Sequence, residues 1–131
     1  MTVIKFYSDT DSFSDYSKKS KFTDINCIEK GSVQIKKSNR LHEQYRMNVG
    51  FSRKEWDDVE GQIKDAIKFL RKYGNEIRKV IRTHKISDVY LDFPSYSKFT
   101  KNNILHQQCF PPPLLSICGK LGVSINLCIY S

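Results

Sequence analysis

Residues 43–73 read "EQYRMNVGFSRKEWDDVEGQIKDAIKFLRKY", and within this stretch the spacing of the apolar residues changes from two to three and four. In the first part, Met47, Val49 and Phe51 alternate with polar residues, which predicts a strand with one buried face. From Trp56 onward the apolar residues recur at intervals of three and four, which predicts an amphipathic helix with one buried stripe. A strand that leads into such a helix favours a fold in which helices pack against a sheet.

The start of this helix is predicted from the residues around position 52. Ser52 and Glu55 match the S-x-x-E capping box, in which each side chain accepts a hydrogen bond from a backbone amide near the other residue. Phe51 and Trp56 match the hydrophobic staple that often surrounds the box. The pattern therefore predicts a helix that begins at Ser52, with Trp56 buried in a structural role.

The apolar stripe continues over residues 77–81, but two residues interrupt it. Gly74 is typical of a helix end and Asn75 of a helix start, so the sequence predicts two helices separated at this point. A helix pair is also found in helix-turn-helix proteins that bind DNA. The second helix lacks the small polar residues at its start that would reach base edges, so we favour core helices with basic outer faces.

Further strands are predicted on both sides of the helices. Residues 2–8 and 88–94 alternate between apolar and polar side chains. Pro94 should end the second run, because proline cannot donate a hydrogen bond to a strand ladder. Residues 24–37 predict a weak strand pair around Gly31, or one interrupted strand.

The end of the chain, "CFPPPLLSICGKLGVSINLCIYS" at residues 109–131, predicts a helix followed by a strand. A residue before proline is pushed out of the helical region, so the helix should begin at Pro113, the last proline of the run, and end at Gly122. The strand that follows, residues 123–130, alternates and is expected to lie inside the sheet. Residues 11–19 predict one or two helical turns.

These elements predict an α+β fold with a single domain over residues 1–131. It should contain a mostly antiparallel sheet of about five strands with the helices packed on one face. A chain of 131 residues, 39% of them hydrophobic, is long and apolar enough to bury one such core. The sequence shows no secretory signal and no apolar run that could span a bilayer, so we expect a cytoplasmic protein with no membrane contact.

Residues that commonly catalyse reactions or bind metals are scattered along the sequence. The four cysteines form no CxxC pair and are expected to be free thiols. The three histidines do not stand beside a nucleophile in a recognised catalytic pattern, and no glycine-rich phosphate loop is present. We therefore predict no enzyme, no catalytic residue, no metal site and no cofactor. The net charge of +8 indicates an anionic partner, either an acidic protein surface or a nucleic acid.

A candidate binding surface follows from the alternation of the strands. If the helices cover the apolar face of the sheet, the opposite face gathers tyrosine, basic and polar residues. Tyrosine and arginine often anchor protein interfaces, and tyrosines on a sheet can also stack on bases. The long connection over residues 95–110 adds two lysines. The predicted partner-binding residues are Lys5, Tyr7, Arg46, Asn48, Tyr90, Asp92, Lys98, Lys101, Asn126 and Tyr130.

Several short motifs follow one another in a distinctive order. They are "FSDYSKK" after the first strand, "EKGS", the strand that enters the long helix, "ISDVYLDF" and the proline-led "LLSICGKLGVSINLCIY". This order resembles a family of small bacterial proteins known only as a domain of unknown function. It is also similar to immunity proteins of bacterial toxin–immunity pairs, in which a proline-started helix, an "LG" turn and a final strand ending in tyrosine recur.

The resemblance implies a protein that binds and neutralises a cognate bacterial toxin domain by occlusion. Because this chain is basic, it also implies a toxin with an acidic contact surface. The alternative is an RNA- or DNA-binding module that uses the basic, tyrosine-bearing sheet face. Residues 45–52, "YRMNVGFS", do not match the RNP1 signature of aromatic RNA readers, so we favour the immunity-type hypothesis.

Overall fold

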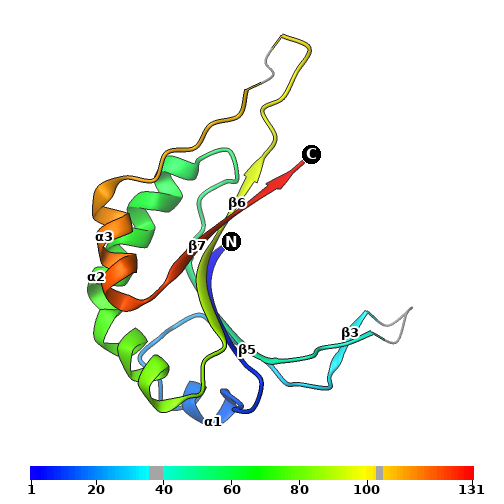
Figure 1. The fold of residues 1–131 in the computed structure, drawn as a ribbon, viewed down its shortest axis with the longest axis vertical. Helices are drawn as coiled ribbons and strands as arrows, with labels where there is room; N and C mark the ends of the chain where they lie inside the picture. The colour runs from blue at the N-terminus through cyan, green and yellow to red at the C-terminus, as the bar shows by residue number, and fades with distance from the viewer. Residues whose placement is uncertain (36–39, 103–104) are drawn as a thin grey trace.

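The computed structural model describes residues 1–35, 40–102 and 105–131. Its longer strands are β1 (Thr2–Ser8), β2 (Ile25–Ile28), β5 (Tyr45–Ser52), β6 (Asp88–Tyr96) and β7 (Ser124–Tyr130). They form a five-stranded sheet in the order β2-β5-β1-β6-β7 (Figure 1). Neighbouring strands are antiparallel except β6 and β7, which are parallel because a helical crossover connects them. The predicted α+β fold with a mostly antiparallel sheet is confirmed.

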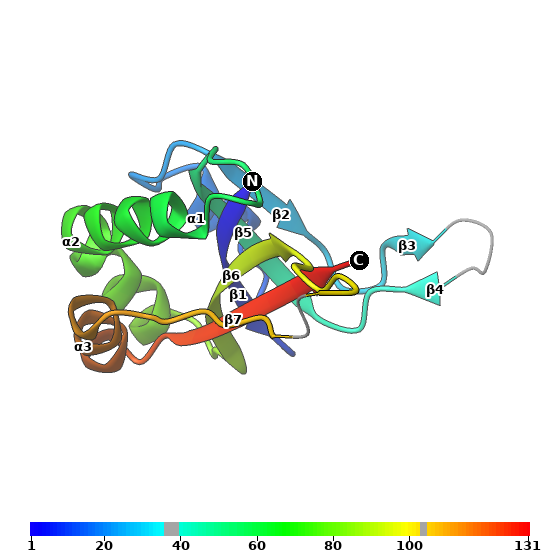
Figure 2. The same cartoon turned by 90° about the horizontal axis from the view of Figure 1, so that it is seen from above.

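The helices are α1 (Ser14–Ser17), α2 (Val59–Thr83) and α3 (Pro112–Leu121). The two longer helices, α2 and α3, lie together on one face of the sheet (Figure 1, Figure 2). The short helix α1 is held at the C-terminal part of α2, where the Tyr16 hydroxyl donates to the Glu76 carboxylate. Beside it, the rings of Phe13 and His84 stack with centroids 5.0 Å apart. The sheet face opposite α2 and α3 is called the open face below.

The core lies between α2, α3 and the sheet, and it follows the alternation of the sequence. In β1, for example, Ile4 and Phe6 are fully buried, whereas Val3, Lys5 and Tyr7, which alternate with them, are partly exposed on the open face. The other strands contribute in the same way, and the helices add one apolar stripe each. The remaining large side chains of the core include Met47, Val49, Ile63, Leu70, Ile77, Leu91, Phe93 and Leu114.

The predicted break at Gly74 is wrong, because α2 is one continuous helix. Ile77 and Val80, beyond the glycine, are fully buried on the same stripe as Leu70. A glycine inside a helix costs about 1 kcal/mol relative to alanine, while burying one aliphatic side chain stabilises by about 1.5–3 kcal/mol. The burial of Ile77 and Val80 therefore stabilises the continuous helix by more than Gly74 destabilises it.

The predicted helix start is also wrong. The helix begins at Val59, and its N-cap is Asp58, whose carboxylate accepts a hydrogen bond of 2.9 Å from the Gly61 amide. Ser52 instead belongs to β5 and donates to Asp65 Oδ2 at 2.7 Å. The capping-box motif was outweighed because Ser52 pairs with β1 in the sheet.

Two predictions at the C-terminal side need correction. The last strand does not lie inside the sheet, since β7 forms one of its edges, next to β6. Pro94 does not end β6, which continues to Tyr96. The last pair between β1 and β6 is Val3 with Asp92, so Pro94 has only β7 as a neighbour, and such a position tolerates the missing amide hydrogen. The crossover helix ends at Gly122 as predicted, with φ of 75°, and begins at Pro112, one residue earlier than expected.

Residues 24–37 were predicted to form a strand pair or one interrupted strand; the structure places the two halves in different sheets, and residues 36–37 lie outside the described residues. The first half, β2, pairs with β5. The second half, β3 (Val33–Ile35), pairs with β4 (Arg40–Leu41) in a separate two-stranded sheet. This hairpin projects from the sheet on the side away from α2 and α3 (Figure 1, Figure 2).

Within the described ranges, no helix is long and apolar enough to cross a membrane.

Candidate protein-binding surface

The strand register places eight of the predicted site residues on the open face. Lys5 lies opposite Asn48 on one side and Tyr90 on the other, and Tyr7 lies opposite Arg46. Next to them, Asp92 pairs with Asn126 across β6 and β7. Tyr130 follows further along β7 on the same side, at two-residue spacing. Four strands that are distant in the sequence therefore contribute to one surface.

The centre of this surface is a contact between two tyrosines and an arginine. The rings of Tyr7 and Tyr90 stack with centroids 5.8 Å apart, and their hydroxyl oxygens are 3.1 Å apart. Arg46 Nη1 donates to the Tyr7 hydroxyl at 3.4 Å, and its guanidinium carbon lies 5.8 Å from the Tyr7 ring centroid. Burial, the Tyr7 hydroxyl and the charge of Asp92 raise the pKa of Tyr90, so this hydroxyl stays protonated at neutral pH.

A second group of contacts is centred on Asp92. Lys5 Nζ lies 3.0 Å from Asp92 Oδ2 and 5.9 Å from the centroid of the Tyr90 ring. The other carboxylate oxygen, Oδ1, accepts from Cys128 Sγ at 3.1 Å and from Asn126 Nδ2 at 3.4 Å. Burial and the neighbouring carboxylate raise the pKa of the Cys128 thiol, which keeps it a donor. We call the two groups together the polar row, which consists of Lys5, Tyr7, Arg46, Tyr90, Asp92, Asn126 and Cys128.

Sequence reasoning missed Cys128 as a member of the polar row. The alternation of β7 did place it on the outer side of that strand together with Asn126 and Tyr130. Its contact with Asp92 depends on the parallel pairing of β6 and β7, which brings Pro94 opposite Cys128 and Asp92 opposite Asn126. The pairing direction is not encoded in the spacing of either strand.

Three aromatic rings form the end of the surface near the chain terminus. Trp56 stacks on Tyr130 with centroids 4.8 Å apart and tilts against Tyr96 at 5.3 Å. Trp56 is half-buried, and it is not part of the predicted staple, because Phe51 stacks on Phe69 instead. The two tyrosines are about half exposed, at 46% for Tyr130 and 53% for Tyr96. Trp56, Tyr96 and Tyr130 are called the aromatic cluster below.

The two predicted lysines of the connection between β6 and α3 lie outside the polar row. Lys98 is exposed and borders a hollow beside the first turn of α2, together with Glu60 and Gln108. Lys101 is exposed further along the connection. Part of the predicted segment 95–110, residues 103–104, lies outside the described residues.

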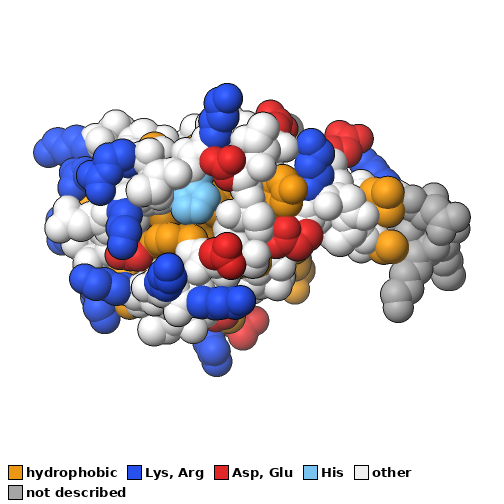
Figure 3. Space-filling view, turned by 90° about the horizontal axis from the view of Figure 1, so that it is seen from below, with side chains coloured by type: hydrophobic (Ala, Val, Ile, Leu, Met, Phe, Trp, Pro, Cys, Tyr) orange, Lys and Arg blue, Asp and Glu red, His pale blue; other side chains and the backbone are white. Residues whose placement is uncertain are grey.

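The charges are distributed unevenly between the two sides of the sheet. On the strands of the open face, Lys5 and Arg46 are balanced by Asp88 and Asp92. The helices carry an excess of basic residues, and seen from below many basic side chains gather where the helices lie (Figure 3). In α2 they are Lys64, Lys68, Arg71, Lys72, Arg78, Lys79 and Arg82, against Glu60, Asp65 and Glu76.

This surface offers hydrogen-bond donors, acceptors and aromatic rings that are already held in place by their neighbours. Among the residues that the structure describes, no group of three His, Cys, Asp or Glu side chains is placed to hold a metal ion. Comparison of the chain with protein-family models, with curated proteins and with solved structures gave no match.

Proposed function

We propose that this chain is an immunity-type protein that binds a cognate bacterial toxin domain and neutralises it by occlusion, without catalysis of its own. The observation that carries the proposal is the polar row on the open face, in which Tyr7 contacts both Arg46 and Tyr90. The resemblance to immunity proteins supplies the class of partner. The site of action would be the cytoplasm of the cell that makes both proteins.

The composition of the open face supports a protein partner. Tyrosine, tryptophan and arginine are the residue types that most often dominate binding energy at protein interfaces. Here the tyrosines and Arg46 stand on strands, Trp56 lies in the turn before α2, and neighbouring side chains hold them, so little conformational entropy is lost when a partner docks. Arg46 and the aromatic cluster are therefore the proposed anchors.

The charge of the chain supports a partner with an acidic contact surface. The net charge of +8 attracts an acidic protein over a distance, and such steering raises the association rate. Arg46 on the open face and the exposed lysines of the connection after β6, which lie outside the polar row, are the cations that an acidic toxin would meet. Lys101→Glu should then slow association more than it changes dissociation.

The test is co-expression with the product of the neighbouring gene, followed by growth protection and binding kinetics. Arg46→Ala, Tyr90→Ala and Tyr130→Ala should each weaken the complex by about 1–3 kcal/mol, or roughly 5- to 150-fold. Arg82→Ala, an exposed arginine on the helical side, is the matched control and should change affinity less than about twofold. The proposal fails if no partner co-purifies and cells carrying the neighbouring gene die equally with and without this protein.

Nucleic-acid binding by the open face is the alternative, and the aromatic cluster is the observation that favours it. Half-exposed tyrosine rings are surfaces on which bases can stack. Titration with RNA and duplex DNA at low and physiological salt separates the two functions. Tight binding at physiological salt that is lost in Tyr130→Ala would favour the alternative, whereas weak binding that disappears with salt would leave the toxin as the partner.

A further inference from the structure

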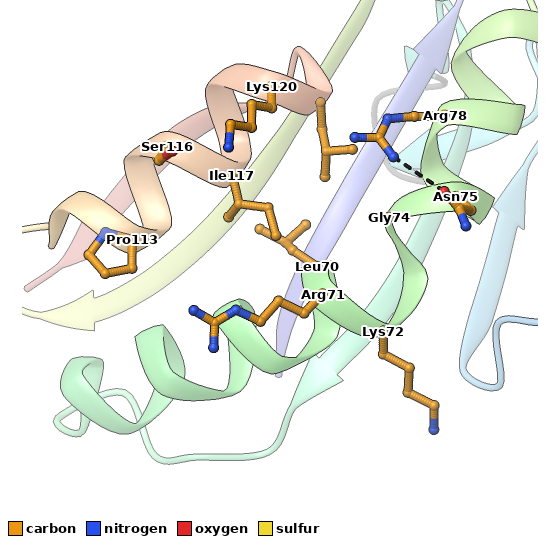
Figure 4. A pocket seen from close by; sticks show the side chains of 11 residues that line it. Leu70, Arg71, Lys72, Gly74, Asn75, Arg78, Pro113, Ser116, Ile117 and Lys120 are labelled. Carbon is orange, nitrogen blue, oxygen red and sulfur yellow. Dashed lines mark hydrogen bonds between the residues drawn. The ribbon is translucent and has the colours of Figure 1, made fainter.

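A groove between α2 and α3 lies on the helical side of the sheet, away from the open face (Figure 4). Its volume is about 470 Å³, which falls within the range of sites for small-molecule ligands. Its floor is apolar and includes Leu70, Ile117 and Leu121. Gly74 faces the same space, and a methyl group added there would come within 3.8 Å of Leu121.

Four cationic residues line the groove, Arg71, Lys72, Arg78 and Lys120, and only Lys72 has an acidic residue four positions away, Glu76. Arg71 and Arg78 come from α2 and Lys120 comes from α3, and Figure 4 shows them on different sides of the groove. Arg78 Nη1 donates to Asn75 Oδ1 at 3.2 Å, which holds that guanidinium at the rim. A ligand on the floor would therefore meet positive charge from both helices.

Three of these cations lack the acidic partners that usually accompany exposed helical charges. The positions three and four residues away from Arg71, Arg78 and Lys120 along their helices carry no Asp or Glu. No carboxylate lines the groove, and no ion pair involves these three residues within the described part of the chain. Three like charges gathered without a counter-charge repel one another, and a bound anion would remove that repulsion.

We propose that the groove binds a small phosphorylated ligand with an apolar or planar body, of the nucleotide class. Phosphate oxygens match the planar donor fork of arginine, which can donate two parallel hydrogen bonds to one phosphate. The apolar floor accommodates the body of the ligand, and Ser116 supplies a hydroxyl at the wall. This site is separate from the proposed toxin-binding surface, and neither depends on the other.

The probes are ATP, adenosine and tripolyphosphate, titrated calorimetrically into the full chain at physiological salt. ATP should bind most tightly, because it has both phosphates and a planar body. Tripolyphosphate should bind about tenfold more weakly, and adenosine should not saturate the site. Ile117→Ser should weaken ATP binding and leave tripolyphosphate binding unchanged, since only the body contacts the floor.

The charge variants test which cations take part. Arg71→Gln, Arg78→Gln and Lys120→Gln should each weaken ATP binding about tenfold or more. Lys79→Gln is the matched control, because Lys79 is an exposed lysine of α2 that does not line the groove. It should change ATP affinity less than about twofold. All four positions are on helix surfaces, and circular dichroism confirms that each variant is folded.

Three results would overturn the proposal. The first is that none of the phosphorylated probes binds. The second is that Lys79→Gln weakens binding as much as the groove variants do, which would indicate a diffuse charge effect. The third is that a single-stranded oligonucleotide or an acidic peptide binds more tightly than ATP and loses affinity in the same variants, since the groove would then serve a macromolecule.

Discussion

The contact between Tyr16 and Glu76 connects the first part of the chain to α2, and its contribution to stability can be measured. Tyr16→Phe removes the hydroxyl that donates to the carboxylate but keeps the ring, which packs edge-on against His84 at 5.4 Å. The other donors to the same oxygen, the Ser20 hydroxyl and the Lys21 amide, are both at 3.5 Å and cannot replace it. The variant therefore leaves the carboxylate with weak partners only.

The magnitude follows from the charge and position of the carboxylate. A hydrogen bond to a charged group contributes about 1.5–3 kcal/mol when it is well buried. Glu76 is 8% exposed, but its carboxylate lies near the protein surface, where water screens part of the interaction. We expect Tyr16→Phe to lower the free energy of unfolding by about 1–2 kcal/mol. With a urea slope of roughly 2 kcal/mol per M, the unfolding midpoint should fall by about 0.5–1 M.

The pH dependence of the stability loss in Tyr16→Phe tests whether the Glu76 carboxylate is its cause. Burial raises the pKa of Glu76, but the hydrogen bonds from Tyr16 and the Lys21 amide and the nearby lysines lower it more, so it lies below the usual 4.5. A lowered pKa in the folded state stabilises the protein above the unfolded-state pKa, and this stabilisation is lost as the pH falls through the folded-state pKa. The difference between Tyr16→Phe and the parent should be full at pH 7 and shrink below about pH 4.

The matched control is Tyr73→Phe, which makes the same chemical change on α2. The Tyr73 ring packs against Phe69 at 5.0 Å, and its hydroxyl makes no hydrogen bond within the described residues. The urea unfolding midpoint of Tyr73→Phe should therefore differ from that of the parent by less than about 0.25 M. Equal shifts for the two variants, or a Tyr16→Phe effect that is unchanged between pH 7 and pH 3, would refute the reasoning.

Three further predictions concern the helices and the thiols. Gly74→Ala should raise the free energy of unfolding by about 0.5–1 kcal/mol, because alanine loses less backbone entropy than glycine in a helix and its methyl group makes only an ordinary contact with Leu121. A loss of stability in urea unfolding would contradict one continuous α2. Asp58→Ala should cost about 1 kcal/mol in the same assay, and no change would show that Asp58 does not cap the helix. Exposed Cys109 should react with a thiol reagent at pH 8, while Cys118, buried with a pKa raised to about 11, should react only after unfolding; comparable rates by mass spectrometry would contradict its burial.

The alternation of the strands was the most informative signal in the sequence. It placed Ile4 and Phe6 in the core and Lys5 and Tyr7 on the open face without any knowledge of the pairing. This works because side chains on a strand alternate strictly between two faces, so burial of one residue fixes the side of the next. The membership of the open face could thus be predicted, although the contacts within it could not.

The errors arose where a local motif competed with contacts that are distant in the sequence. Ser52 carries a good capping signal, but pairing with Thr2 keeps it in β5. Gly74 carries a good termination signal, but the burial of Ile77 keeps the helix intact. Trp56 was assigned to a staple, while its actual neighbours, including Tyr130, lie far away in the chain. Tertiary contacts outweigh local propensities of about 1 kcal/mol in each of these places.

The separation of charge between the two sides of the sheet changes how the composition should be interpreted. The sequence suggested that the basic residues and the tyrosines share one surface. The alternation of the strands does not show how many of the basic residues lie on the helices instead of on the sheet. In the structure the open-face strands are balanced, with Lys5 paired to Asp92, whereas α2 and α3 together carry eight basic residues against three acidic ones. At physiological salt, charges separated by more than about 8 Å are largely screened.

The helical cations therefore contribute little at the open face itself. An acidic partner is attracted to the helical side at least as strongly as to the open face, so net charge alone does not select the docking surface. Selection has to come from short-range contacts, and these are concentrated in Arg46, the tyrosine pair and the aromatic cluster. If the toxin docks on the open face, its specificity should follow the shape and hydrogen bonding of those rings, while the charge total of +8 governs only how fast the two proteins meet.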